Sequence, residues 1–266
     1  MINMSLKRML ELNEKVILII GGSGHLGAVM CEALSEFGAT LIIADIDQEK
    51  TESLSQDLKK RYNNEIVSVK LDTSSLSNIN EIVNGIVDRY KKIDVLINSA
   101  YFGSGKELIS MKESDWNLGI DGSINSVYRS TKIVLPYMIE KKYGKIINIA
   151  SMYGIVAPDV SIYDNNDYYN PANYGAGKAA VIQFTKYIAS VYGKYNINCN
   201  SISPGPFPNK EVQKDKEFVR SLKSRVPLGR IGEPNELKGI LVLLSSDASS
   251  FINGANIIVD GGWTIR

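Results

Sequence analysis

Tyr174 and Lys178, a phenol and an ammonium four residues apart, are the side chains of this sequence best suited to proton transfer. This spacing places both on one face of a helix, which we expect to run to about Tyr192. A nearby ammonium stabilises a phenolate, so Lys178 is expected to lower the pKa of Tyr174 from its usual value of about 10. The pair could then exchange a proton with a substrate hydroxyl at neutral pH.

The same spacing occurs at two other places in the chain, Tyr128/Lys132 and Tyr137/Lys141. Both of these pairs precede an apolar run at 146–150, whereas Tyr174 follows that run and Ser151. Open α/β sheets bind ligands at the carboxyl ends of their strands. Position in the chain, rather than spacing, therefore favours Tyr174 and Lys178 as the catalytic pair.

A glycine-rich turn follows the apolar run Ile17–Ile20 and precedes a helical pattern. The turn reads Gly21-Gly22-Ser23-Gly24-His25-Leu26-Gly27. Glycines let the backbone approach a pyrophosphate, whose charge is met by free N–H groups at the start of the helix. We therefore expect the whole turn to contact a dinucleotide. His25, the only histidine, is interpreted as a residue of this turn rather than a catalytic base or metal ligand.

Asp45 follows the glycine turn at the end of the next apolar run, about 20 residues downstream as expected for a carboxylate that binds the adenosine ribose. Its negative charge would repel the 2′-phosphate of NADP, so the sequence favours NAD. An exposed carboxylate at the end of a strand is the alternative interpretation.

The elements that must position these residues alternate between apolar runs and helical patterns. The runs that predict buried strands are Val16–Ile20, Leu41–Ala44, Ile66–Val69, Val95–Asn98, Ile146–Ala150 and Ile257–Val259. Their alternation with helices predicts an α/β fold with a parallel sheet. Because no linker or repeat divides the chain, we expect one domain over residues 15–266.

Two segments are expected to lie outside the regular elements. Residues 1–14 are interpreted as an N-terminal extension, in which a frayed segment is favoured over a short amphipathic turn formed by Leu6, Met9 and Leu10. Residues 158–173 are crowded with Asp, Asn, Tyr and Pro, which predicts an inserted surface loop beside the substrate pocket.

The composition favours a small-molecule partner. The 30 Lys and Arg residues nearly balance 29 Asp and Glu residues, so no strong field attracts nucleic acid or an anionic membrane. No apolar run approaches the roughly 20 residues of a membrane span, and no export signal is recognised. Cys31 and Cys199 lie far apart, which favours reduced thiols in the cytoplasm over a disulfide or a metal site.

From about Leu12 to its end, the chain resembles the classical short-chain dehydrogenase/reductase family. Asn98-Ser99-Ala100 is similar to the family's Asn-Asn-Ala-Gly segment, and Asn148-Ile149-Ala150-Ser151 to its catalytic-serine strand. Further similar segments are Ser203-Pro204-Gly205-Pro206, Pro227-Leu228-Gly229-Arg230, Gly232-Glu233-Pro234 and Val259-Asp260-Gly261-Gly262.

The resemblance implies a single-domain Rossmann fold, a doubly wound and mostly parallel seven-stranded sheet, and a homo-oligomer, either a tetramer or a dimer. It also implies that Ser151 hydrogen-bonds the reacting oxygen, Tyr174 transfers the proton and Lys178 binds the nicotinamide ribose. The further cofactor contacts that it implies are Ile46, Asp72, Thr73, Asn98, Ala100, Pro204, Gly205 and Phe207.

The chain departs from the family pattern at three positions. His25 replaces the second glycine of the turn, although Gly24 offers an alternative. Ser123 stands where the family has its relay asparagine; Asn125 lies two residues later, where it would not share the same helix face. Asn209 replaces a threonine. We expect cofactor binding to be kept. At the relay position, either Ser123 holds the relay water with its hydroxyl or the relay runs differently from that of the family.

The inserted loop and its neighbours resemble the branch of flagellin-modification and sialic-acid-like sugar pathway dehydrogenases and, more distantly, gluconate 5-dehydrogenases. We therefore expect NAD-dependent hydride transfer at a carbinol or ketone carbon of a sugar or sugar phosphate. Loop residues suited to binding its hydroxyls are Tyr163, Asn165, Asn166, Asp167, Tyr168 and Tyr169.

Two alternatives remain open. One is a 3-oxoacyl-thioester reductase of the acyl-carrier type, with a cationic docking surface formed by Lys210, Lys214, Lys216, Arg220, Lys223 and Arg225. The other belongs to a different class, a catalytically weakened nucleotide-binding scaffold or sensor, suggested by His25 and Ser123.

Overall fold

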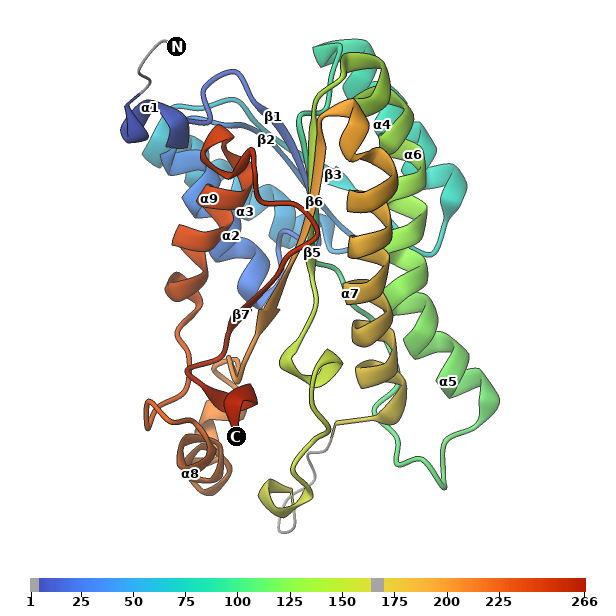
Figure 1. The fold of residues 1–266 in the computed structure, drawn as a ribbon, viewed down its shortest axis with the longest axis vertical. Coiled ribbons are helices and arrows are strands. Elements are labelled where there is room, and N and C mark those ends of the chain that lie inside the picture. The colour runs from blue at the N-terminus through green and yellow to red at the C-terminus, as the bar shows by residue number, and fades with distance from the viewer. Residues whose placement is uncertain (1–4, 164–169) are drawn as a thin grey trace.

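The computed structural model describes residues 5–163 and 170–266 (Figure 1). Within these residues, seven parallel strands form one sheet in the order β3-β2-β1-β4-β5-β6-β7. The strands are β1 (Val16–Ile20), β2 (Thr40–Asp45), β3 (Ile66–Lys70), β4 (Val95–Asn98), β5 (Gly144–Ile149), β6 (Ile197–Pro204) and β7 (Asn256–Val259). The order changes direction between β1 and β4, as in a doubly wound Rossmann sheet. The expected fold class is confirmed.

Helices cover both faces of the sheet (Figure 1). One face carries α2 (His25–Glu36), α3 (Gln48–Tyr62) and α9 (Lys238–Ser245). The other carries α4 (Leu76–Tyr90), α6 (Ser126–Lys141) and α7 (Ala172–Tyr192). The shorter helices are α1 (Leu6–Leu10), α5 (Glu113–Ile120) and α8 (Lys216–Arg225).

Strand β1 shows how the sequence determines this layered arrangement. All five of its side chains are buried, and alternate residues point to opposite faces of the sheet. Ile17 and Ile19 join the core beneath α2, whereas Leu18 joins the core beneath α4 and α6. Each such buried aliphatic side chain contributes about 1.5–3 kcal/mol. The central strand is thereby fixed, and it holds the glycine turn at its carboxyl end.

Strand β6 was not located by the apolar runs, because polar residues interrupt it. Its sequence is Ile-Asn-Cys-Asn-Ser-Ile-Ser-Pro, and most of these residues are buried. The Asn200 side chain donates to the Ile252 carbonyl at 2.9 Å, and the Ser201 hydroxyl donates to Asn256 at 2.8 Å. Hydrogen bonding makes the burial of such groups tolerable, so a central strand can lack an apolar run.

The expectation of a frayed N-terminal segment was wrong for the residues that the structure describes. Helix α1 is capped by the Ser5 side chain, which accepts from the Arg8 N–H. Leu12 is completely buried, and its N–H donates to the Phe37 carbonyl at 2.9 Å. Leu12 thus anchors the segment to the core, so residues 5–14 form part of the packed fold.

None of the helices within residues 5–163 and 170–266 is long and apolar enough to cross a membrane.

Candidate active site

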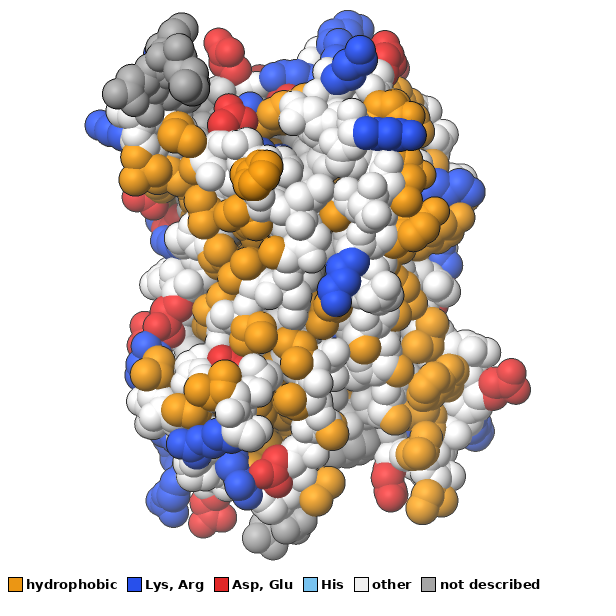
Figure 2. Space-filling view, viewed as in Figure 1, with side chains coloured by type: hydrophobic (Ala, Val, Ile, Leu, Met, Phe, Trp, Pro, Cys, Tyr) orange, Lys and Arg blue, Asp and Glu red, His pale blue; other side chains and the backbone are white. Residues whose placement is uncertain are grey.

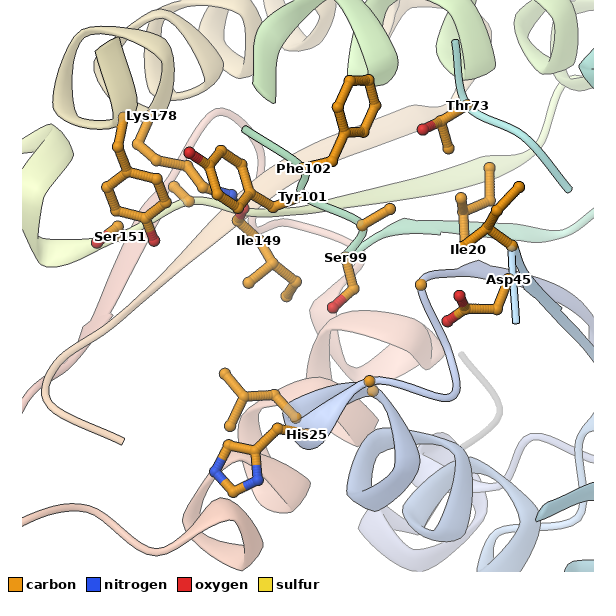
Figure 3. A pocket seen from close by; sticks show the side chains of 18 of the residues that line it. Ile20, His25, Asp45, Thr73, Ser99, Tyr101, Phe102, Ile149, Ser151 and Lys178 are labelled. Atoms are coloured by element: carbon orange, nitrogen blue, oxygen red, sulfur yellow. The ribbon is translucent and has the colours of Figure 1, made fainter. Parts of the chain in front are cut away.

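A cavity of about 980 Å³ opens at the carboxyl ends of the central strands (Figure 3). Its lining residues include Gly21, Asp45, Ser99, Ser151 and Gly205, each at or within two residues of the end of a strand. Ser151, Lys178 and Tyr101 lie together in one part of this view, and Asp45 and Thr73 lie in another. The cavity is therefore long enough to present a glycine turn and a catalytic centre to one ligand.

The glycine turn has the close backbone contacts that a dinucleotide requires. A Cβ atom on Gly27 would lie 2.1 Å from the Gly21 carbonyl oxygen, and one on Gly21 would lie 2.5 Å from the Ala100 nitrogen. Gly21 also has a φ of +82°, which favours glycine. Helix α2 begins at His25, so its first N–H groups lie beside the cavity. This arrangement fits the pyrophosphate of a dinucleotide.

Not every residue of the turn reaches the cavity. Gly21, Gly24, His25, Leu26 and Gly27 line it. Gly22 and Ser23 are absent from the lining residues. A Cβ on Gly22 would lie 2.6 Å from the side chain of Ile43, so that glycine serves packing in the core.

Asp45 lies in the cavity and is tied to the glycine turn. Its carboxylate accepts a hydrogen bond from the Ser23 N–H at 3.0 Å. Ser23 thus acts through Asp45, by orienting the carboxylate at the end of β2. Ile46, the next residue, also lines the cavity and is 58% exposed. The geometry agrees with a ribose-binding carboxylate.

Asp72 and Thr73 line the same part of the cavity. The Asp72 carboxylate accepts hydrogen bonds from the side chain and N–H of Ser74, which lower its pKa. Arg129 donates to the Thr73 carbonyl at 3.2 Å and forms an ion pair with Asp121. These contacts order the loop that the family resemblance assigns to the adenine.

The three expected catalytic side chains come together at the far end of the cavity. Ser151 follows β5, whereas Tyr174 and Lys178 lie one turn apart on α7. The Lys178 ammonium donates to the Ile149 carbonyl at 2.7 Å. Ser151 forms a hydrogen bond that favours the Tyr174 phenolate. A carbonyl placed between Ser151 and Tyr174 could receive a hydrogen bond from one and a proton from the other.

The expected lowering of the Tyr174 pKa by Lys178 is not observed. Burial raises the pKa of Tyr174, and only the hydrogen bond from Ser151 opposes the shift. Burial also lowers the pKa of Lys178 to about 8. The ammonium lies 5.7 Å from the centre of the Tyr174 ring and donates to a backbone carbonyl instead. Exclusion of water, rather than the neighbouring cation, dominates the Tyr174 proton affinity in this structure.

The two rival pairs lie on α6, which precedes β5, and neither lines the cavity. Tyr128 is 45% exposed, with the Lys132 ammonium 5.6 Å from the centre of its ring. Tyr137 donates to the Asn84 side chain at 2.7 Å. The Tyr128/Lys132 pair therefore reproduces the spacing and distance of the catalytic pair without its surroundings.

Two assigned residues, Asn98 and Ser123, do not reach the cavity. The Asn98 amide donates to Asn148 at 2.8 Å and accepts from Ser130 at 2.6 Å, which ties β4 to β5 and α6. The Ser123 hydroxyl donates to the Gly119 carbonyl at 2.6 Å. A Cβ on Gly177 would lie 1.9 Å from this hydroxyl oxygen. Asn98 and Ser123 thus support the sheet and the catalytic helix by packing and hydrogen bonding.

Ser123 lies in a π-helical turn, Asp121–Asn125, between α5 and α6. Such turns insert one residue into a helix and often occur at functional sites. Asn125 donates to the Asp121 carboxylate at 3.1 Å and is absent from the cavity lining. These contacts do not assign Asn125 the relay role, and the sequence did not predict that role for it either.

The nicotinamide-side residues Ala100, Pro204, Gly205 and Phe207 all line the cavity, as does Asn209. A Cβ on Gly205 would lie 2.5 Å from the Asp260 Cα, so this turn requires a glycine.

A hydrogen bond with the Phe207 backbone favours protonation of His25, but burial has the larger effect and lowers the His25 pKa. The imidazole thus contacts the segment facing the glycine turn.

Lining residues that were not predicted from the sequence include Tyr101, Phe102, Leu118 and Asp121. Tyr101 could have been noticed in the sequence, because it stands where the family that the chain resembles has the glycine of Asn-Asn-Ala-Gly. No sequence pattern points to Phe102 or Leu118, since their inward positions depend on how the segment from β4 to α5 folds.

The described part of the inserted segment is packed rather than solvated. Ile162 is buried in a small core with Phe218 of α8 and Trp263, and the Tyr153 and Tyr163 hydroxyls lie 2.7 Å apart. Asp159 forms an ion pair with Arg225. The segment therefore joins the β5 end of the cavity to α8. The hydroxyl-binding candidates Asn165, Asn166, Asp167, Tyr168 and Tyr169 lie outside the described residues.

The family of the chain follows from comparison with known proteins. Residues 23–264 match the family described as enoyl-(acyl carrier protein) reductase. The 3-oxoacyl-[acyl-carrier-protein] reductase of Thermotoga maritima is 34% identical, over 96% of this chain and 100% of its own. Together with the Rossmann sheet, these matches show that the chain belongs to the short-chain dehydrogenase/reductase family. It is an oxidoreductase that uses a nicotinamide cofactor.

Other relatives differ in substrate and cofactor. The NAD-dependent glycerol dehydrogenase of Listeria innocua is 30% identical, over 96% of each chain. A gluconate 5-dehydrogenase from Burkholderia cenocepacia, solved with NADP and tartrate, has a TM-score of 0.87 and 27% identity over 98% of this chain and 100% of its own. The similarity therefore establishes the enzyme class and leaves the choice of substrate and dinucleotide to the residues of the site.

Proposed function

We propose that the protein transfers hydride between NAD(H) and a carbinol or ketone carbon, with Tyr174 as the acid and base. The observation that carries this proposal is that Ser151, Tyr174 and Lys178 line the same cavity as the glycine turn. NAD(H), when bound, supplies or accepts the hydride. Ser151 binds the reacting oxygen, Tyr174 gives it a proton during reduction or takes one during oxidation, and Lys178 binds the nicotinamide ribose.

Asp45 supports NAD rather than NADP as the cofactor. Its carboxylate lies in the cavity at the end of β2, where a 2′-phosphate would meet its negative charge. We expect Asp45→Ala to raise the kcat/KM ratio for NADP over NAD about tenfold, which corresponds to about 1.4 kcal/mol. Steady-state kinetics with both cofactors measures this ratio. Glu49→Ala, which removes a nearby exposed carboxylate from α3, is the control. An unchanged ratio in Asp45→Ala would exclude the proposed role.

A sugar or sugar-phosphate derivative is the proposed substrate class. The residues lining the cavity include Tyr101 and Phe102, whose rings are suited to packing against the C–H face of a sugar, and Asn209, whose amide is suited to its hydroxyls. The glycerol and gluconate relatives act on polyhydroxylated compounds, as their names state. Membership of the flagellin-modification and sialic-acid-like branch is a prediction within this proposal.

Reduction of a 3-oxoacyl thioester is the second candidate, favoured by the Thermotoga maritima relative. The cationic surface expected to dock an acyl carrier is partly neutralised, because Lys214 pairs with Glu211 and Arg225 with Asp159. The third candidate, a weakened scaffold or sensor, is disfavoured by the retention of Ser151, Tyr174 and Lys178, which all line the cavity.

A panel of keto sugars, sugar phosphates, polyols and 3-oxoacyl thioesters, assayed with NAD(H) and NADP(H), tests the proposal. We expect the highest kcat/KM with a polyhydroxylated compound and NAD(H). Preference for an acyl thioester would select the second candidate. NADH binding without turnover of any compound would favour a scaffold.

We also propose a cytoplasmic homo-oligomer, a tetramer or a dimer. Strand β7 is an edge of the sheet, and Ile258 on it is 43% exposed, near Leu228 and Ile265 around a second cavity. Figure 2 shows hydrophobic side chains spread over the molecular face that bears β7. Apolar edges of this kind are usually covered. Sedimentation velocity is expected to give an oligomer, and a monomer at micromolar concentration would contradict it.

A further inference from the structure

Arg129 on α6 is absent from the residues that line the cavity, yet it contacts a loop that does line it. The Arg129 guanidinium donates to the Thr73 carbonyl at 3.2 Å. Figure 3 shows Thr73 and Asp45 in one part of the cavity, away from Ser151 and Lys178. Under the proposed function, the nicotinamide lies at the catalytic residues and the pyrophosphate at the glycine turn, so the adenosine lies beside Thr73. Arg129 therefore supports the adenosine end of the cavity from outside.

We refer to residues 71–75, which follow β3, as the adenosine loop. Two of its hydrogen bonds stay within the loop or reach α4: the Ser74 hydroxyl donates to the Asp72 carboxylate at 2.7 Å, and the Asp72 N–H donates to the Asn78 side chain at 2.9 Å. Arg129 adds a hydrogen bond from a second helix, at the carbonyl of Thr73, which lies between Asp72 and Ser74. The loop is thus held from two sides, by α4 and by α6.

Arg129 is itself held by Asp121. Its two terminal nitrogens donate to the two carboxylate oxygens of Asp121, one of them at 3.1 Å. Such a two-pronged pair is stronger and more directional than a single charged hydrogen bond. The Asp121 carboxylate also accepts from the Asn125 amide at 3.1 Å. Both side chains of the ion pair are mostly buried, with 20% of Arg129 and 26% of Asp121 exposed. The guanidinium is therefore held in the orientation from which it reaches the Thr73 carbonyl.

The π-helical turn Asp121–Asn125 brings the two members of this ion pair onto one face. Asp121 and Arg129 are eight residues apart, on a helix that runs without a break from α5 through the turn into α6. Because the turn inserts one residue, the two positions are related as residues seven apart in a regular α-helix, which share a face. The turn is closely packed, since a Cβ on Gly122 would overlap the Phe102 carbonyl. It thus aligns Asp121 with Arg129.

We propose that Arg129 is a positioning residue for the adenosine end of the dinucleotide. Held by Asp121, it fixes the Thr73 carbonyl and with it the loop against which the adenosine binds. The inference rests on the proposed function and adds a residue that acts on the cofactor without touching it. Since the contacts of Arg129 lie at the adenosine end, its loss should weaken cofactor binding and leave the hydride step intact.

The first test measures binding at the two ends of the dinucleotide. Arg129→Ala is expected to raise the dissociation constants of NADH and of ADP about tenfold, because it removes charged hydrogen bonds that order the adenosine loop. NADH is titrated by fluorescence, and ADP, which lacks the nicotinamide, by displacement of NADH. At saturating NADH, kcat should keep its wild-type value, whereas general damage to the fold would lower it.

Lys132→Ala is the matched control. Lys132 lies three residues later on α6, its ammonium is 5.6 Å from the centre of the Tyr128 ring, and its loss removes the same charge. This variant should bind NADH and ADP as the wild type does. Arg129→Gln keeps much of the side chain without its charge, so it should weaken binding as well, and it replaces Arg129→Ala if that variant does not fold. Unchanged NADH binding in the Arg129 variants, or weaker NADH binding with unchanged ADP binding, would overturn the proposal.

A double-mutant cycle tests whether Arg129 acts together with Asp121. Asp121→Asn removes the charge that holds the guanidinium and keeps the shape of the side chain. If the two residues act as one unit, the Asp121→Asn/Arg129→Ala protein should bind NADH about as tightly as Arg129→Ala alone. Losses that add in full would show that Asp121 acts on the dinucleotide independently, which would contradict the role assigned to the pair.

The binding constants separate this inference from the proposed function. If the wild type binds NADH and ADP but turns over no carbonyl or carbinol compound, the proposed function fails, while the Arg129 variants still decide the inference. If the wild type transfers hydride and the Arg129 variants bind NADH and ADP as tightly as it does, the inference fails and the proposed function stands.

Discussion

Replacing Tyr174 by phenylalanine is expected to lower kcat by about 10²–10⁴-fold, the usual contribution of a positioned general acid or base. The substitution removes the hydroxyl that we propose exchanges the proton, and it keeps the ring that packs against Tyr101. Binding of NADH should change little, because the glycine turn and Asp45 do not contact this hydroxyl. Steady-state kinetics, together with a fluorescence titration of NADH, measures both quantities.

Tyr128→Phe is the matched control for this prediction. Tyr128 has a lysine four residues later, and that ammonium lies 5.6 Å from its ring centre, against 5.7 Å for Lys178 and Tyr174. Tyr128 lies outside the cavity, so its substitution should leave turnover unchanged. Equal activities of Tyr174→Phe and the wild type would show that another group transfers the proton.

The second large effect is expected at the glycine turn. A Cβ on Gly27 would lie 2.1 Å from the Gly21 carbonyl oxygen, so Gly27→Ala must displace the turn that faces the pyrophosphate. Overpacking of this kind costs about 1–3 kcal/mol. If that cost appears in binding, the dissociation constant for NADH rises roughly 5- to 150-fold. Calorimetric or fluorescence titration of the folded variant measures this change.

Gly24→Ala offers the graded comparison within the same turn. Its Cβ would lie 3.4 Å from the same Gly21 oxygen, an ordinary van der Waals contact, so NADH binding should weaken much less. Similar losses in the two variants would indicate that the turn is disturbed by any side chain. Unchanged NADH binding in Gly27→Ala would mean that the dinucleotide does not bind at this turn.

The sequence revealed the parts of the site that depend on local pattern. The glycine turn and Asp45 could be predicted because strand, turn and helix are adjacent in the chain. Ser151, Tyr174 and Lys178 could be placed because both segments follow the same strand. The seven-stranded fold followed from alternating apolar runs and helices together with the family resemblance. The glycine turn and Asp45 needed only the residue types and their order, whereas the number of strands needed the resemblance as well.

The remaining features depend on contacts between distant segments. Ser123 occupies the expected position in the sequence, yet its hydroxyl donates to the Gly119 carbonyl of α5 and packs against Gly177. The raised Tyr174 pKa reflects burial by several segments, which a spacing of four residues cannot reveal. Tyr101 reaches the pair because the segment at Gly103 folds back over it. Such effects require the packed structure.

The most direct test of hydride transfer uses NADH that carries deuterium at the transferring position of the nicotinamide. The protein is incubated with this cofactor and a panel of keto sugars, and the products are analysed by mass spectrometry and NMR. The account predicts one deuterium on the new carbinol carbon with the wild-type protein and far less with Tyr174→Phe. NADH binding without deuterium in any product, or equal transfer by Tyr174→Phe, would contradict it.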